Sequence, residues 1–365
     1  YIEVPFSICC YCAVATDTKG NLYVYGYFEG KHWVWKFNAD GKPANDFGRG
    51  NTFNLGYSNA GRGFIDIDEN GNIYIPGSYH NVACFSPEGK YLYSIGGWDS
   101  KQREKCTTSP TGIAFGLNNK IYISDGGGGG YRFKVYNRTK KGFEGFLYSA
   151  STLCQNYPTY LYWYEKNREN KIELKGAPNY GYGWGAPFIC SDGIGNIYAV
   201  SGNASGYNTL IKCQDTGKDI IKCYMLPRQT FKNPTGCHYT KEGVIYVADR
   251  DNNRIVKVFD TGEALSISWE FGKDILKGPH DITTSPDGKS VYVLEDTFSL
   301  PKTYRKAKYI EKEITNKEGK KIKIKVLSDK GRKINIVDTF LKGEGRLLKF
   351  NLKYSEIDMA KIKVE

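Results

Sequence analysis

Residues 234–263 read PTGCHYTKEGVIYVADRDNNRIVKVFDTGE, and this stretch decides the fold. An apolar segment leads into a turn with Glu and Gly, and the run VIYVAD follows, centred on Tyr246. An Asn- and Asp-rich turn then leads into a third apolar segment, RIVKVFD. Short runs of β-branched and aromatic residues between such turns are typical of antiparallel strands joined by hairpins. The stretch therefore predicts three consecutive strands of one small sheet.

The same unit occurs six times along the chain, and a tyrosine marks its register. The other copies are CAVATDTKGNLYVYG from Cys12, GFIDIDENGNIYIPG from Gly63, PTGIAFGLNNKIYISD from Pro110, PFICSDGIGNIYAVSG from Pro187 and PHDITTSPDGKSVYVLED from Pro279. The aligned tyrosines are Tyr23, Tyr74, Tyr122, Tyr198, Tyr246 and Tyr292. One unit cannot bury its own apolar face, whereas six units packed radially bury both faces of every sheet. We therefore predict an all-β fold, a six-bladed β-propeller that takes up residues 1–365 as a single domain.

The fifth unit carries a family resemblance as well as a fold signal. Its segment YVADRDNNRIVKVFDTGE resembles the NHL repeat, whereas DGGGGGYRFKVYN in the third unit and SGNASGYNTLIKCQD in the fourth depart from that pattern. The resemblance covers roughly the whole chain outside two insertions and implies a six-bladed NHL-type propeller. It identifies the fold more specifically than the function.

The chain is also distantly similar to propellers of the peptidylglycine amidating lyase type. That resemblance implies a zinc ion held in the central channel by histidines of several inner strands. His280 stands where such a ligand would stand, but Phe188, Thr235 and Thr111 occupy the corresponding places in other units, and none of these binds zinc well. The zinc histidine set of that family is therefore missing.

Carboxylates on the inner strands offer another site in the central channel. Asp66, Asp192 and Asp281 lie on or beside predicted inner strands, and Asp281 follows His280 directly. Oxygen ligands of this kind suit calcium, and they also bond backbone groups in turns. These four residues are our candidates for a metal-assisted lyase or hydrolase site, with calcium as the one cofactor considered and no cofactor as the simpler expectation.

The first insertion, residues 149–186 between the third and fourth units, is rich in aromatic residues. Those we single out as candidate binding residues are Tyr160, Tyr162, Trp163, Tyr164 and Trp184. Flat aromatic faces suit sugar rings and also anchor protein interfaces, so the cluster indicates a glycan or a protein partner without choosing between them. The alternative is that the loop folds into a small core of its own.

The second insertion, residues 301–346 in the last unit, is basic. It holds 15 Lys and Arg against 6 Asp and Glu, so most of the chain's net charge of +12 lies there and a nucleic-acid partner is not indicated. Alternating apolar and charged residues predict a three-stranded meander, with Lys321, Lys323 and Lys325 on one face. These lysines either pair with Glu311 and Glu313 on the preceding strand or contact an acidic surface, a glycan or a neighbouring subunit.

Cysteine usage points to an oxidising compartment. Ten cysteines without the paired C-x-x-C spacing of a zinc ribbon favour disulfides, with buried thiols as the alternative. Cys213 and Cys223 flank the turn segment QDTGKDII, and we predict that they form a disulfide across a hairpin. The chain starts with Tyr and has no apolar run of membrane-spanning length, which fits an exported product. We expect an extracellular or cell-surface location, with the periplasm as an alternative.

The predicted propeller is complete without residues 1–10, which leaves an N-terminal extension strand to pair within the molecule or with a neighbour. We therefore predict a non-catalytic extracellular binding or scaffold protein that recognises a protein partner or associates with itself through edge strands and insertions. The alternatives are the channel enzyme and a carbohydrate-binding protein.

Overall fold

The computed structural model describes residues 12–28, 31–55, 64–77, 80–102, 105–126, 132–150, 160–165, 168–173, 188–202, 207–295, 308–315, 321–328 and 347–351. The N-terminal extension strand predicted over residues 1–10 lies outside these residues, as does Trp184. No helix within these ranges is long and apolar enough to cross a membrane.

The described strands form six sheets of three or more strands. Across the first sheet, in order, lie β1 (Ala13–Thr16), β2 (Leu22–Phe28), β3 (Lys31–Phe37), β5 (Asn51–Asn54) and β4 (Phe47–Gly48). Across the second lie β6 (Asp66–Ile67), β7 (Ile73–Gly77), β8 (Asn81–Phe85) and β9 (Tyr91–Gly96). Across the third lie β10 (Pro110–Gly116), β11 (Lys120–Asp125), β12 (Arg132–Asn137) and β13 (Phe146–Ala150).

The remaining sheets continue this order along the chain. The fourth comprises β16 (Phe188–Ser191), β17 (Asn196–Ser201), β18 (Thr209–Asp215) and β19 (Ile220–Met225). The fifth comprises β20 (Pro234–Tyr239), β21 (Val244–Asp249), β22 (Arg254–Asp260) and β23 (Leu265–Phe271), with the 3-10 helix η3 (Arg250–Asn252) between its second and third strands. The last comprises β24 (Pro279–Thr284), β25 (Ser290–Glu295) and β28 (Leu347–Asn351).

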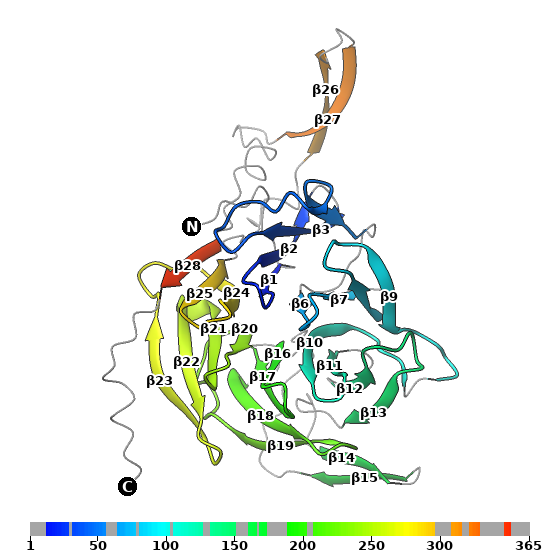
Figure 1. Cartoon of the computed structure of the whole chain (residues 1–365), viewed down its shortest axis with the longest axis vertical. Helices are drawn as coiled ribbons and strands as arrows, with labels where there is room; N and C mark the ends of the chain where they lie inside the picture. Colours follow the sequence, from blue (N-terminus) through cyan, green and yellow to red (C-terminus); the bar gives the residue numbers. More distant parts are fainter. Residues whose placement is uncertain are drawn as a thin grey trace.

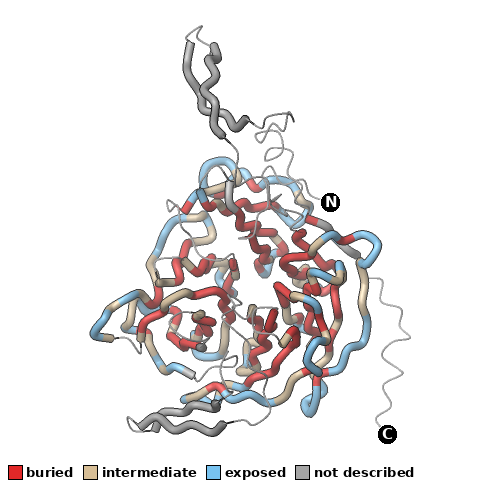
Figure 2. The backbone as a smooth tube through the Cα atoms, turned by 180° about the vertical axis from the view of Figure 1, so that it is seen from behind, coloured by how far each residue is buried: buried red, intermediate tan, exposed pale blue. Residues whose placement is uncertain are grey.

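The sheets stand around one axis, so the chain is an all-β propeller. Figure 1 shows the first strand of each sheet, β1, β6, β10, β16, β20 and β24, near the centre, and the last strands at the rim. Buried residues gather on the inner strands and exposed residues on the outer strands and turns (Figure 2). This distribution is the one expected when each sheet buries both faces against its neighbours.

The inner hairpin of three sheets is built by a repeated aspartate. Asp17, Asp68 and Asp192 each accept hydrogen bonds from backbone N–H groups two and four residues further on, and from the side chain of the asparagine four residues on. Such a side chain replaces the backbone bonds that a tight turn leaves unmade. The segments DTKGNLY, DENGNIY and DGIGNIY thereby fix where the inner strand ends and the second strand begins.

The tyrosine that marks each repeat unit lies in the core. Tyr23, Tyr74, Tyr122, Tyr198, Tyr246 and Tyr292 are all buried. The first two donate their hydroxyl hydrogens to the turn aspartates of their own sheets, whereas Tyr122 donates to Asp215 and Tyr198 to Asp260, both on the next sheet along the chain. A buried phenol needs such a partner.

The hydrophobic core is divided among the gaps between neighbouring sheets. One cluster joins the first and second sheets, and corresponding clusters follow around the ring. The ring is closed by a cluster in which Val14, Val24 and Trp35 of the first sheet pack with Tyr292 and other residues of the last. Full burial of each such side chain contributes on the order of 1.5–3 kcal/mol. The first and last sheets are therefore joined by an apolar cluster of the same kind as those between consecutive sheets.

The strand content of the last sheet differs from the prediction. The repeat count predicts six blades. The structure shows five sheets of four or five strands, which count as five blades, and a further sheet, β24–β25–β28, with three described strands. Its third strand, β28, comes after the basic insertion and pairs with β25. The repeat pattern marks only the first strands of a unit, so it could not report how many strands complete it.

The structure does not bring Cys213 and Cys223 together as the predicted disulfide requires. The register of β18 and β19 pairs Cys213 with Lys222 and Lys212 with Tyr224, so an irregularity leaves Cys223 without an opposite residue. The side chain of Cys213 is buried, whereas Cys223 is an exposed free thiol. A single extra residue at a bulge directs the two side chains apart.

Both insertions contain a two-stranded antiparallel sheet. In the aromatic insertion β14 (Tyr160–Glu165) pairs with β15 (Arg168–Glu173). In the basic insertion β26 (Lys308–Thr315) pairs with β27 (Lys321–Ser328), with Glu311 opposite Lys325 and Glu313 opposite Lys323. The third strand predicted for the basic meander lies outside the described residues.

Candidate functional site

The inner strands, which lie around the axis of the ring (Figure 1), carry two carboxyl groups and two histidines. The four side chains are Asp66 on β6, His238 on β20, and His280 and Asp281 on β24. Three of them, Asp66, His280 and Asp281, are the candidates predicted from the sequence. His238 was not predicted to belong with them, because it lies further along its strand than the aligned positions.

Asp281 connects three neighbouring inner strands. The backbone N–H of Val14 on β1 donates to Asp281 Oδ2 at 2.9 Å. On the other side the carboxyl group lies so close to Gly236 of β20 that a Cβ there would approach Asp281 Oδ1 to 2.6 Å. Gly236 is therefore required by this close approach. Burial raises the pKa of Asp281 to about 7, the backbone bonds from Val14 and Ile282 oppose the shift, and the nearby Asp66 adds to it.

Asp66 lies in a similar environment. Desolvation of its carboxyl group, together with the charge of Asp68, raises its pKa to about 7. A hydrogen bond from the backbone N–H of Ile67 to its Oδ1, at 2.8 Å, opposes this shift. Two carboxyl groups that titrate near neutrality, close enough to affect each other, are the feature that marks candidate acid–base sites.

His280 lies beside two aromatic rings. Its ring centroid is 6.5 Å from that of Phe188, and Phe188 is 5.0 Å from Phe64, a residue of the second sheet's first segment. Because the second and fourth sheets are not neighbours, these rings meet across the axis. His280 hydrogen-bonds the backbone of Cys12, and its buried Nδ1 has no partner among the described residues. Burial and the charge of Arg250 lower its pKa to about 4, so the ring is neutral at physiological pH.

His238 is neutral for the same reason. Burial lowers its pKa to about 4, and its Nε2 lies 3.1 Å from Thr284 Oγ1 on the next inner strand. Thr284 is part of the ring closure, since Thr16 Oγ1 donates to its carbonyl at 2.7 Å. His238 thus joins neighbouring inner strands, which is a structural role.

Asp192 does not belong to this site, contrary to the prediction. Its carboxylate forms the β16–β17 turn by accepting hydrogen bonds from the backbone N–H groups of Ile194, Gly195 and Asn196. The segment SDGIGN resembles the turns around Asp17 and Asp68. This resemblance is the feature of the sequence that indicates a turn at Asp192.

The axis residues suit proton transfer better than tight metal binding. In the ranges that the structure describes, no group of three or more His, Cys, Asp or Glu side chains is arranged to hold a metal ion. Asp66 and Asp281 supply only two carboxyl groups, and calcium takes roughly six to eight oxygen ligands. A carboxyl group with a pKa near 7 is present in both protonation states at neutral pH and is able to act as an acid or a base.

The predicted binding residues lie on the inserted hairpins. Tyr160, Tyr162, Trp163 and Tyr164 are on β14, and Lys321, Lys323 and Lys325 are on β27. The structure describes the backbone of these strands only. Their proposed contacts with a glycan or a protein therefore stay predictions.

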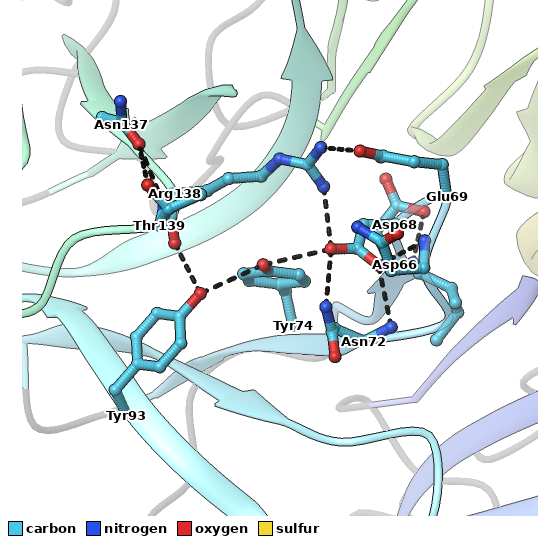
Figure 3. A network of polar contacts seen from close by, with 11 residues as sticks. Asp66, Asp68, Glu69, Asn72, Tyr74, Tyr93, Asn137, Arg138 and Thr139 are labelled. Carbon is cyan, nitrogen blue, oxygen red and sulfur yellow. Dashed lines mark hydrogen bonds and ion pairs between the residues drawn. The ribbon is translucent and has the colours of Figure 1, made fainter. Parts of the chain in front are cut away.

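A buried ion pair supports the second sheet directly behind Asp66. Arg138, which follows the third sheet's β12, donates from Nη1 to Asp68 Oδ2 at 2.8 Å and from Nη2 to Glu69, as Figure 3 shows. Tyr93 donates its hydroxyl hydrogen to the Arg138 carbonyl at 2.6 Å. Asp68 is two residues from Asp66, so this network fixes the strand that carries the axis carboxyl group.

The outer strands carry a feature that the repeat pattern does not reveal. On β9, β13, β19 and β23 large apolar side chains are exposed, namely Tyr91, Leu92, Leu147, Ile221, Ile267 and Trp269. Runs such as YLYSIG and LSISWEF contain the signal, because an outer strand lies at the rim and leaves consecutive residues exposed. The repeat alignment ended before these strands and therefore passed over them.

The axis carboxyl groups predict a pH dependence of stability. Their folded-state pKa of about 7 lies above the unfolded value of about 4, so between these values the folded chain holds protons that the unfolded chain has released. Stability therefore falls as the pH rises through this window. Asp281→Asn is expected to raise the free energy of unfolding at about pH 8 by ~2–4 kcal/mol relative to the parent, and to change it little at about pH 4.

Thermal melts at the two pH values measure this difference. Asp40→Asn is the matched control, because Asp40 is exposed and its pKa is lowered by hydrogen bonds to Lys42. An equal effect of Asp281→Asn at both pH values would contradict the raised pKa.

Comparison with known proteins finds solved structures that are similar to this chain, but it identifies no family for the chain. No family pattern and no curated protein matches the chain. Among solved structures it is similar to a streptogramin B lyase, at 14% identity over 90% of this chain and 86% of that one, with a TM-score of 0.48. It is also similar to a functionally unknown protein from Desulfotomaculum acetoxidans DSM 771, at 14% identity over 80% and 75%, with a TM-score of 0.46.

A third similar structure is the catalytically inactive virginiamycin B lyase from Staphylococcus aureus with quinupristin, at 13% identity over 86% of this chain and 83% of that one, with a TM-score of 0.43. At such identities a likeness in structure concerns the fold alone. That the chain is an all-β propeller rests on its own described sheets.

Proposed function

We propose that this chain is a non-catalytic extracellular β-propeller that acts as a binding and scaffold protein and associates with further copies of itself through its outer strands. The observation that carries the proposal is that large apolar side chains are exposed on β9, β13, β19 and β23, the outer strands of four sheets. The extracellular location is part of the proposal and rests on the cysteine content of the sequence.

The outer strands combine apolar side chains with an open backbone edge. In the described sheets β13, β19 and β23 each pair with one neighbour only, so the other edge of these three strands is not paired. The outer edge of β9 is partly covered, because Ile95 forms a parallel bridge with Gly142. An exposed apolar edge strand invites pairing with another chain, and proteins that stay single usually cover or charge it. On β23 Trp269 is 53% exposed and Ile267 44% exposed, and both are residues that bury well in an interface.

The proposal is tested first on β23. Replacing Ile267 and Trp269 together by lysine is expected to weaken self-association at least roughly tenfold, because two charges then lie in the proposed contact. The measurement is molar mass by light scattering during size-exclusion chromatography over a range of concentrations. Both side chains are exposed, so the melting temperature is expected to change little.

The matched control is Ile194→Lys, because Ile194 is 69% exposed but lies in the β16–β17 turn. It should leave association unchanged. Equal association of the parent and the β23 variant would remove the support that this strand gives to the proposal.

We also propose that β24–β25–β28 is a sixth blade, so that the propeller is six-bladed and of the NHL type. The three strands pack against the first sheet and the fifth, as a blade of the ring does. The resemblance of residues 246–263 to the NHL repeat supports the finer assignment.

A second candidate function is a lyase or hydrolase reaction at the axis. The raised pKa of Asp66 and Asp281 favours it, since one carboxyl group is able to take a proton while the other donates one. Metal analysis of protein purified without chelators tests the metal-assisted form of this reaction. Stoichiometric calcium or zinc that is lost in Asp66→Asn would favour it over the scaffold proposal, and protein without bound metal would count against it.

A further inference from the structure

Two buried cysteines of neighbouring sheets lie on adjacent inner strands, in the same hydrophobic cluster. Cys190 is on β16 of the fourth sheet and Cys237 on β20 of the fifth. Both belong to the hydrophobic cluster between these sheets, and β16 and β20 are adjacent inner strands. The sequence places 46 residues between them, so only the ring arrangement brings them together.

The position of the Cys237 thiol follows from its contacts. Its Sγ lies 3.7 Å from the carbonyl oxygen of Tyr198 and 3.8 Å from that of Phe188. Tyr198 is the residue paired with Cys190 in the β16–β17 ladder, and Phe188 is two residues before Cys190. The Cys237 thiol therefore extends across the gap between the sheets toward the backbone on both sides of Cys190.

We propose that Cys190 and Cys237 form a disulfide that links the fourth and fifth sheets when the chain folds in an oxidising compartment. The bond would replace the weak hydrogen bonds that the Cys237 thiol makes with carbonyl groups by a covalent link between two inner strands. The other described cysteines are not in the hydrophobic cluster that contains Cys190 and Cys237, and Cys223 is exposed on an outer strand.

The oxidation is a thiol–disulfide exchange with a small disulfide such as oxidised glutathione. The thiolate of Cys190 attacks one sulfur of the oxidant, breaks its S–S bond and releases one thiol. The thiolate of Cys237 then attacks the Cys190 sulfur of the mixed disulfide and releases the second thiol. Two electrons pass to the oxidant, and the two protons leave with the released thiols.

Because both cysteines are buried in the folded chain, the disulfide is expected to form during folding rather than afterwards. Both cysteines are less than one-tenth exposed, and burial together with the neighbouring Cys237 raises the pKa of Cys190 well above its ordinary value. A thiol with a raised pKa is a poor nucleophile, so the folded chain is expected to oxidise slowly and the refolding chain quickly.

The experiment refolds the full chain in a glutathione redox buffer, alkylates the remaining thiols under denaturing conditions and maps the peptides by mass spectrometry. The expected result is one linked peptide pair containing Cys190 and Cys237. Reduction should then lower the melting temperature by about 5 °C, because the bond closes a long loop of the unfolded chain.

Variants separate this bond from other oxidations. Cys223→Ala should keep the redox-dependent shift in melting temperature, whereas Cys190→Ala should lose it. Should Cys190→Ala fail to fold, the peptide map of the parent decides alone. Alkylation of both cysteines after oxidative refolding, or a bond from either one to a different cysteine, would overturn the proposal.

Discussion

Replacing Arg138 by alanine is expected to lower the free energy of unfolding by about 3–5 kcal/mol. The guanidinium group is 6% exposed and bridges the third sheet to Asp68 and Glu69 of the second (Figure 3). Its removal leaves the carboxylate of Asp68, which is 2% exposed, without its only described cation. An uncompensated buried charge is far more costly than a lost surface pair.

Equilibrium denaturation with a chemical denaturant measures the change. Lys42→Ala is the control, because Lys42 and Asp40 form an ion pair whose side chains are 80% and 53% exposed, and such pairs contribute about 0–1 kcal/mol. A loss below ~1 kcal/mol in Arg138→Ala would show that the ion pair is not buried as described.

Asp260→Asn is expected to cost a similar amount, about 3 kcal/mol or more. Asp260 ends β22 in the fifth sheet and accepts hydrogen bonds from three side chains of the fourth: Tyr198 at 2.7 Å, Tyr224, and Lys212 at 2.6 Å. Burial acts to raise the pKa of Asp260, but the bonds from Lys212 and Tyr224 outweigh it and lower the pKa. An amide in this place leaves the ammonium group of Lys212, 10% exposed, without a counter-charge.

Two further variants test this prediction, one that should reproduce the effect and one that should lack it. Asp215→Asn should have the same effect, since Asp215 accepts from Lys120, Tyr122 and Tyr148 in the same way between the third and fourth sheets. Glu263→Gln should have almost none, because Glu263 is exposed in the hairpin that follows Asp260. Nearly equal and additive decreases in the free energy of unfolding for Asp215→Asn and Asp260→Asn would show that the same kind of polar contact joins both pairs of sheets. A large decrease for Glu263→Gln would contradict this account.

The propeller fold was predictable because it rests on local patterns that repeat. The turn around Asp17, Asp68 and Asp192 is encoded within seven residues, and the tyrosine that follows each turn is buried as its alternation with valine and isoleucine implies. Once the unit is seen six times, the need to bury both sheet faces leads to a ring.

Features that depend on one residue of register were not predictable. A single irregularity opposite Lys212 separates Cys213 from Cys223, and nothing in QDTGKDII announces it. For the same reason Cys190 and Cys237 could not be paired from the sequence, since their contact depends on how two sheets pack. Register and packing are set by the whole fold and not by neighbours in the chain.

The candidate site was predictable in part. Asp66, His280 and Asp281 are near the axis because they belong to inner strands, which the repeat identifies. His238 was missed because it lies further along β20 than Thr235, the residue that aligns with His280. Asp192 was misassigned because a turn aspartate and an axis aspartate look alike in a short motif. The function of the chain depends on contacts between molecules, which no repeat pattern encodes.

Electron microscopy of the chain, taken from its native source and kept under non-reducing conditions, tests the scaffold proposal most directly. We expect ordered assemblies in which propeller rings touch through their outer strands, and their loss in the variant with lysine at positions 267 and 269. Single rings with the 41.1 kDa mass of one chain at every concentration would contradict the proposal, and would turn attention to Asp66 and Asp281 at the axis.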